Sequence, residues 1–218
     1  VEVQYLCLME TLLKQLRMLG DTKQMANASA IFSKEESEKL DVMLRMTNTA
    51  MNNLNKLLSI ESFVTVVSQL FQSTIPHIRR KALQLFIEKI TNEDHDDTAV
   101  KMLANTLSIL ETMLTCTSTS SKKKKAKGKT TEDSQKDEDK TLVMVFDGIA
   151  VLSEIVLDSD VLDRKKDYLR VLSTLVDILQ ERLEGGACLW ATKVAAGGVE
   201  CIGKLCEKLG VHALPKIS

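Results

Sequence analysis

The segment from Ile75 to Phe86 places the strongest constraint on the fold of this chain. Pro76 follows an apolar, helix-like stretch and is itself followed by three cations, Arg79 to Lys81, and then by an amphipathic pattern. Proline fits the first turn of a helix because its missing N–H would have been unpaired there. The segment therefore predicts a sharp turn between two antiparallel helices, as in an α-solenoid repeat.

The composition favours helices packed on helices, hence an all-α fold. Aromatic residues make up only 4% of the 218 residues and there are two prolines, so Leu, Val, Ile, Ala and Met carry most of the apolar content. Lys plus Arg number 29 against 30 for Asp plus Glu. No overall field therefore draws the chain to nucleic acid or to an anionic membrane, and any charge-driven binding must be local.

Apolar residues recur at spacings of three and four along most of the chain, which is the period of an amphipathic helix. Gly20 and Gly210 are placed to close helices, Ser62 and Pro76 to begin them, and Asp97 to cap the helix after an acidic turn. The predicted helices span residues 3–19, 36–58, 62–72, 76–90, 98–114, 142–157, 163–183 and 187–209.

Glycines also stand inside the last predicted helix, in the run Ala195-Ala196-Gly197-Gly198. Each costs a helix about 1 kcal/mol relative to alanine. A close approach of another helix compensates for this cost, or else the helix bends there.

Residues 115–140 hold no apolar periodicity and are rich in Ser, Thr, Lys and acids. This composition predicts a disordered loop. The expected organisation is therefore helical repeats over residues 1–114, the loop over residues 115–140, and further repeats of the same solenoid over residues 141–218.

The first half of that loop carries six lysines within eight residues, and the second half carries five acids against two lysines. The six are Lys122, Lys123, Lys124, Lys125, Lys127 and Lys129. A basic octamer is typical of a nuclear localisation signal or of a tail that contacts RNA phosphates, while the structural alternative is a solvated loop that keeps the repeats soluble. These lysines are the candidate contacts for an import factor or RNA.

Arg79 and Arg80 are the second candidate site. Cations in the first helical turn oppose the helix dipole, so a hydrogen bond or carboxylate partner must offset the cost. We expect one arginine to bond to a neighbouring repeat's loop and the other to be solvated; contact with RNA phosphate or a partner protein is the functional alternative. No aromatic side chains lie nearby for base stacking.

The sequence carries no recognisable catalytic, cofactor or metal motif. It has no phosphate-binding glycine loop, and His77, His95 and His212 show no nucleophile-and-carboxylate spacing, so surface or capping roles are expected for them. The five cysteines form no CxxC pair and are interpreted as reduced, intracellular and mostly buried in the core. We expect no enzyme activity, no cofactor, no metal and no small-molecule substrate.

No apolar run is long enough for a transmembrane span, so no membrane partner is expected. The first residues lack the pattern of a signal peptide. Because the chain starts without Met and stops abruptly, we expect it to be a fragment of a longer polypeptide.

Alternate predicted helices recur at intervals of roughly forty residues once the polar loop is set aside, which is near the HEAT period. The segment from Ser62 to Leu85 resembles a HEAT repeat, with Pro76, Arg79, Ala82 and Leu85 matching the pattern of its second helix. Thr74 and Ile75 stand where an aspartate is often found, so a regular Asp–Arg ladder is not expected.

More narrowly, two segments and the basic loop resemble the large nucleolar HEAT-repeat proteins of the small-subunit processome. The segments are Arg79-Arg80-Lys81-Ala82-Leu83 followed by Glu88-Lys89-Ile90, and Leu209-Gly210-Val211-His212-Ala213-Leu214-Pro215. The resemblance implies a non-catalytic scaffold in the nucleus and nucleolus that acts in ribosome biogenesis and pre-rRNA processing. Its implied partners are other ribosome-assembly proteins and pre-rRNA or small nucleolar RNA.

Two other functions compete with this one. A HEAT-type adaptor in transport or signalling would receive a peptide or phosphatase subunit on its concave surface, with the lysine loop serving solubility alone. An enzyme whose active site lies elsewhere in a parent polypeptide would use these repeats as a regulatory arm, but no residue of the sequence supports it.

Overall fold

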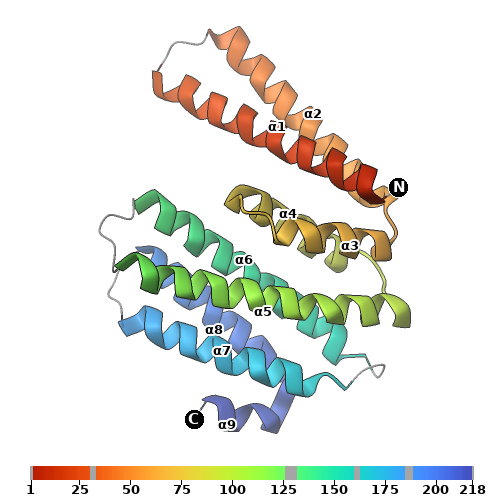
Figure 1. Cartoon of the computed structure of the whole chain (residues 1–218), viewed down its shortest axis with the longest axis vertical. Helices are drawn as coiled ribbons and strands as arrows, with labels where there is room; N and C mark the ends of the chain where they lie inside the picture. Colours follow the sequence, from red (N-terminus) through yellow and green to blue (C-terminus); the bar gives the residue numbers. More distant parts are fainter. Residues whose placement is uncertain (1, 30–32, 126–131, 160–162, 185–188, 218) are drawn as a thin grey trace. The chain divides into compact units, whose positions relative to one another are not determined.

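The structure is a computed structural model that describes residues 2–29, 33–125, 132–159, 163–184 and 189–217. All regular structure in these ranges is helical, which confirms the all-α prediction (Figure 1). The helices are α1 (Glu2–Ser29), α2 (Lys34–Leu57), α3 (Ile60–Phe71), α4 (Pro76–Asn92), α5 (Asp97–Lys125), α6 (Glu132–Leu157), α7 (Lys165–Glu184) and α8 (Leu189–Leu209), followed by the 3-10 turn η1 (Gly210–Ala213) and the short α9 (Leu214–Ile217). Within the described ranges, no helix has the length and apolar character needed to cross a membrane.

The chain divides into two compact units, residues 1–85 and 86–218. The division falls inside α4, whereas the sequence placed its main interruption at residues 115–140. Because α5 and α6 pack against each other, the lysine-rich segment connects two helices of one unit.

In the first unit, α1 packs against both α2 and α3. The ends of α1 and α2 that adjoin their connection are tied by an ion pair between Lys23 and Asp41, so these helices form an antiparallel hairpin. The start of α2 is fixed by a capping box, in which Ser33 Oγ accepts from the Glu36 N–H and the Glu36 carboxylate accepts from the Ser33 N–H. Such a box satisfies two backbone donors at a helix start. The buried apolar side chains of this unit include Met9, Leu13, Leu16, Met51, Phe63, Val67, Leu70, Ile78, Ala82, Leu83 and Leu85.

In the second unit, α5 packs against α6, and α7 packs against α8. Alternate helices are also in contact, α5 with α7 and α6 with α8. The buried side chains are mostly aliphatic, with Phe86, Phe146 and Tyr168 as the largest. A Cβ added at Gly198 would lie 2.5 Å from Leu179 Cδ2, so α8 approaches α7 closely there, as one of the two sequence alternatives predicted. Gly210 ends α8 with a positive φ of 58°, a conformation that glycine adopts without strain.

Several predicted helix ends differ from those observed. α1 continues through Gly20, beside which an added Cβ would meet no atom within 4 Å. Ser59, not Ser62, caps α3 by accepting the Ser62 N–H. Asp96, not Asp97, caps α5 by accepting the Ala99 N–H.

The described parts of residues 115–140 are helical, contrary to the predicted loop: α5 extends to Lys125 and α6 begins at Glu132. Apolar periodicity stops here, but the helical backbone continues over residues 115–125 and 132–140. Asp139 is only 3% exposed, so the α6 end of this segment belongs to the packed unit. Residues 126–131 lie outside the described residues.

Candidate interaction surfaces

The six predicted lysine contacts fall at the end of α5. Lys122 to Lys125 are the last four residues of α5. Lys127 and Lys129 lie outside the described residues. The cluster is thus attached to a helix that packs against α6 and α7.

Arg79 has a partner in the turn that precedes its own helix. Its guanidinium Nη1 donates to the Ser73 carbonyl at 2.7 Å, in the turn between α3 and its own helix. The bond supplies a partner for a first-turn cation and braces the turn between α3 and α4. Arg80 is half-buried, which differs from the solvated side chain that was expected.

The cations of α4 surround His77 together with a residue of α1. Burial lowers the pKa of His77, and the positive charges of Arg80, Arg17 and Lys81 lower it further, while Asp21 opposes them. The ring nitrogen Nε2 is buried and has no hydrogen-bond partner among the described residues. His77 is therefore a half-buried residue whose protonated form is disfavoured by a basic cluster, whereas the sequence predicted a surface or capping role.

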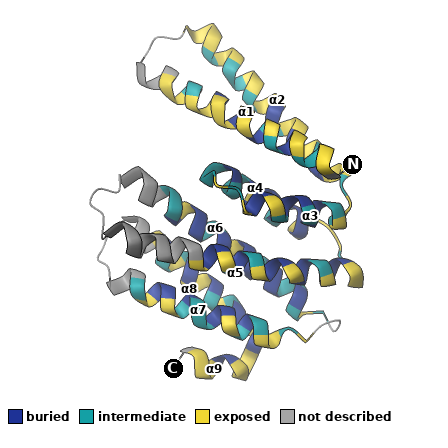
Figure 2. Cartoon of the chain, in the orientation of Figure 1, coloured by how far each residue is buried: buried dark blue, intermediate teal, exposed yellow. Residues whose placement is uncertain are grey.

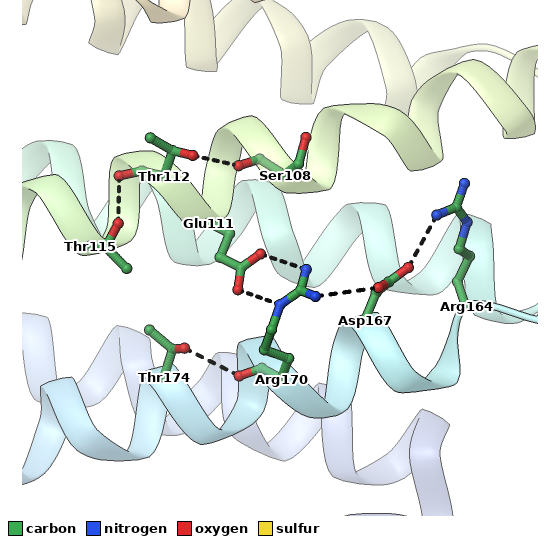
Figure 3. A network of polar contacts seen from close by, with 8 residues as sticks. All are labelled: Ser108, Glu111, Thr112, Thr115, Arg164, Asp167, Arg170 and Thr174. Atoms are coloured by element: carbon green, nitrogen blue, oxygen red, sulfur yellow. Dashed lines mark hydrogen bonds and ion pairs between the residues drawn. The ribbon is translucent and has the colours of Figure 1, made fainter.

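A polar network joins α5 to α7 in the second unit (Figure 3). Arg170 donates to both carboxylate oxygens of Glu111 at 2.7 and 2.8 Å, and Arg164 Nη2 donates to Asn105 Oδ1 at 3.4 Å. Asp167 lies between the two arginines, 3.1 Å from Arg164 and 3.7 Å from Arg170. Because both inter-helix contacts span 59 residues, α5 and α7 run in the same direction.

A second set of ion pairs joins α6 to α8. Lys204 lies 3.3 Å from Glu154, and Lys208 lies 2.5 Å from Asp158. Both pairs span 50 residues, so these two helices also run in the same direction. Sequence reasoning missed both ladders, although the equal spacing between a cation on one helix and a carboxylate or amide on the alternate helix was the signal that could have revealed them.

The α6–α8 contact also holds the most strongly perturbed thiol. Burial raises the pKa of Cys201 to about 12, with the charge of Asp147 adding to the shift. Burial and the nearby Glu200 raise the pKa of Asp147. At neutral pH the Cys201 thiol is protonated and a poor nucleophile.

The other cysteines and histidines occupy varied places. Cys7 is exposed, contrary to the expected core position, and Cys206 is half-buried; the side chains of Cys116 and Cys188 lie outside the described residues. His95 Nε2 lies 2.8 Å from the Ile90 carbonyl near the end of α4, which confirms a capping role. Among the described residues, no group of three or more His, Cys, Asp and Glu side chains is arranged to hold a metal ion.

Exposed residues run along both α1 and α2 in the first unit (Figure 2), and several of them are large apolar residues. They include Val3, Met18 and Met25 on α1, and Val42, Met43, Met46 and Leu57 on α2. Scattered exposed apolar residues are ordinary, but several along one helix mark a surface that can bind a partner.

No family model matches the chain, and neither the curated proteins nor the solved structures give a match.

Proposed function

We propose that this chain is part of a non-catalytic α-solenoid scaffold of stacked antiparallel helix pairs. The observation that carries the proposal is the parallel stacking of alternate helices, α5 with α7 and α6 with α8, each held by two polar contacts at a constant offset. In a solenoid, each helix pair covers the apolar face of the next, so equivalent helices of successive pairs lie side by side in the same direction.

The proposed role of this scaffold is ribosome biogenesis in the nucleolus, namely small-subunit processome assembly and pre-rRNA processing. Its support is the resemblance of Arg79-Arg80-Lys81-Ala82-Leu83, of Leu209-Gly210-Val211-His212 and of the lysine run to nucleolar HEAT-repeat proteins. The partners would be other assembly proteins, with binding spread over several helix faces. HEAT-type adaptors in transport or signalling share the architecture and are the alternative.

Affinity purification from cells tests this role, using a tagged form of the protein that contains this chain. Co-purification of pre-rRNA, small nucleolar RNA and small-subunit assembly factors is the expected result. Recovery of phosphatase subunits or transport cargo without ribosomal precursors would move the function to the adaptor alternative.

The lysine run is proposed to contact RNA phosphates or an import factor. Replacing all six lysines, 122 to 125, 127 and 129, with glutamine should weaken RNA binding and flatten its salt dependence. If every lysine contacts a phosphate of single-stranded RNA, the slope of log affinity against log salt falls in magnitude by about 4.

A matched variant carries Lys165→Gln and Lys166→Gln, since both lysines are exposed on α7. It should bind RNA as the unmodified chain does. An unchanged affinity and salt slope in the six-lysine variant would contradict the RNA contact, and circular dichroism would show whether both variants keep the helical core.

A further inference from the structure

The helix α2 carries an exposed apolar face that is separate from the face it buries. Met46 is 67% exposed and Leu57 is 81% exposed, and Met43 lies one turn before Met46 on the same side. The buried residues of α2, Thr47, Met51 and Asn55, belong to a different stripe. One side of α2 therefore packs within its unit while another presents apolar surface to solvent.

The exposed face has the spacing of a coiled-coil seam. Its members alternate at intervals of four and three residues: Lys39, Met43, Met46, Ala50, Asn53 and Leu57, all exposed. An alternating 4–3 spacing keeps one stripe against a second helix over several turns. Methionine side chains adapt their shape to a facing helix. The exposed face therefore has the width of the contact with a single facing helix. Its regular spacing distinguishes it from a scattered apolar patch.

Charges beside the seam indicate which helix can pair with it and in which direction that helix runs. Glu35 and Lys56 lie on the same edge of the seam, at its opposite ends, and both are exposed. In an antiparallel pair, residues on the same edge face each other across the contact. A second α2 in antiparallel orientation places Glu35 of each copy against Lys56 of the other.

The same register brings apolar residues together. When Glu35 of one copy faces Lys56 of the other, the midpoint of the pairing lies between residues 45 and 46. Met43 of one copy then meets Met46 of the other near this midpoint, and Val42 faces Thr49. A parallel pair would set Glu35 and Lys56 against the other edge, which holds Leu40, Thr47 and Leu54 and is partly or wholly buried. The charges of α2 thus complement a second, antiparallel α2.

We propose that the exposed seam of α2 pairs antiparallel with the same seam of a second copy of this chain, with Lys39, Met43, Met46 and Ala50 of each copy forming the contact. Glu35 already forms an ion pair with Lys39 at 2.7 Å. Both side chains of that pair are exposed, and such pairs contribute little. Glu35 can therefore turn to Lys56 of the second copy at small cost.

Sedimentation velocity of the full 218-residue chain over about 1 to 100 µM, the range of weak specific association, measures the pairing. We expect a concentration-dependent dimer. Met46→Glu should weaken it at least tenfold, whereas Met18→Glu should leave it unchanged, because Met18 is similarly exposed, at 69%, but lies on α1 outside the seam. A chain that stays monomeric throughout overturns the proposal and leaves the seam for a helix of another protein.

Charge exchange then tests the antiparallel register. Glu35→Lys alone and Lys56→Glu alone should each lose self-association, since each sets like charges against one another. A mixture of these two single variants should associate again, because both cross-copy contacts then join opposite charges. Misfolding cannot produce this recovery. Equal loss in Met46→Glu and Met18→Glu, or no recovery in the mixture, would overturn the proposal.

Discussion

His77 shows how a residue at the start of a helix can be shielded from solvent and surrounded by like charge. Burial and the charges of Arg80, Arg17 and Lys81 disfavour its protonated form, and Asp21 only partly offsets them. The folded chain therefore binds a proton at His77 less tightly than the unfolded chain does.

This difference predicts a pH dependence of stability. An unfolded histidine has a pKa of about 6.5. The stability of the folded chain with respect to His77 is therefore complete above about pH 6.5. It is lost as the pH falls from that value to the lower pKa of the folded state. Urea unfolding between about pH 5 and pH 7.5 should show that the free energy of unfolding falls more steeply on acidification in the unmodified chain than in His77→Gln. Equal pH slopes in the two proteins would argue against a lowered pKa.

Burial of the Tyr168 side chain has an energetic cost of a different kind, because it removes a hydroxyl group from water. Its ring is wholly buried in the second unit, and its hydroxyl has no hydrogen-bond partner among the described residues. Burial raises the pKa of this hydroxyl far above its usual range. An unpaired buried hydroxyl costs about 1–3 kcal/mol.

Tyr168→Phe should therefore keep or raise the free energy of unfolding, by about 1 kcal/mol. Tyr168→Leu, which also removes ring volume, should lower it because a cavity forms. Chemical denaturation of the three proteins makes the comparison. A loss of stability in Tyr168→Phe would show that the hydroxyl has a partner.

At the scale of elements, the contacts between helices explain why α8 tolerates glycine in its interior. Gly198 faces Leu179 of α7 at a distance that leaves no room for a Cβ, whereas an added Cβ at Gly203 would meet no atom within 4 Å. The two positions belong to one helix, so their intrinsic helix propensities are alike and only the packing differs.

Alanine at these two positions should have opposite effects. Gly203→Ala should stabilise the chain by up to about 1 kcal/mol, the gain in helix propensity. Gly198→Ala should destabilise it by about 1–3 kcal/mol, because Leu179 must shift within a packed core. Thermal and urea unfolding of both variants measure these changes in stability. A similar gain in stability at both positions would rule out the close approach of α7 and α8.

The contact between Glu111 and Arg170 tests the parallel stacking of α5 and α7. The pair is bidentate but Arg170 is largely exposed, so a double-mutant cycle with alanine should give a coupling of about 0.2–1 kcal/mol. The coupling should shrink as salt is added. No coupling at low salt would indicate that these side chains do not meet in solution.

The positions of the helices followed from local pattern, but several of their ends did not. Pro76 begins α4 as expected, because a proline restricts the first turn wherever it stands. Gly20 failed as a stop signal because its cost of about 1 kcal/mol is smaller than the gain from continuing a helix that packs against α2 and α3. The polar ends of α5 and α6 were missed because helical hydrogen bonding needs no apolar stripe.

At the scale of the whole molecule, the chain forms two units whose boundary lies within α4. The sequence shows no break there, because the division depends on which residues pack together, and a continuous helix carries no local sign of it. In the second unit, the two ladders of polar contacts are likewise invisible in any single helix, since each pair is separated by 50 or 59 residues.

The sequence by itself determined the all-α class, the positions of most helices and the places of its charged segments, because helical periodicity, proline and clustered charge act over a few neighbouring residues. Tertiary structure alone decided that His77 and Asp139 lose their exposure and that α2 keeps an apolar face outside the core. Those features depend on which distant side chains come into contact, and burial and charge environment are properties of such contacts rather than of the local chain.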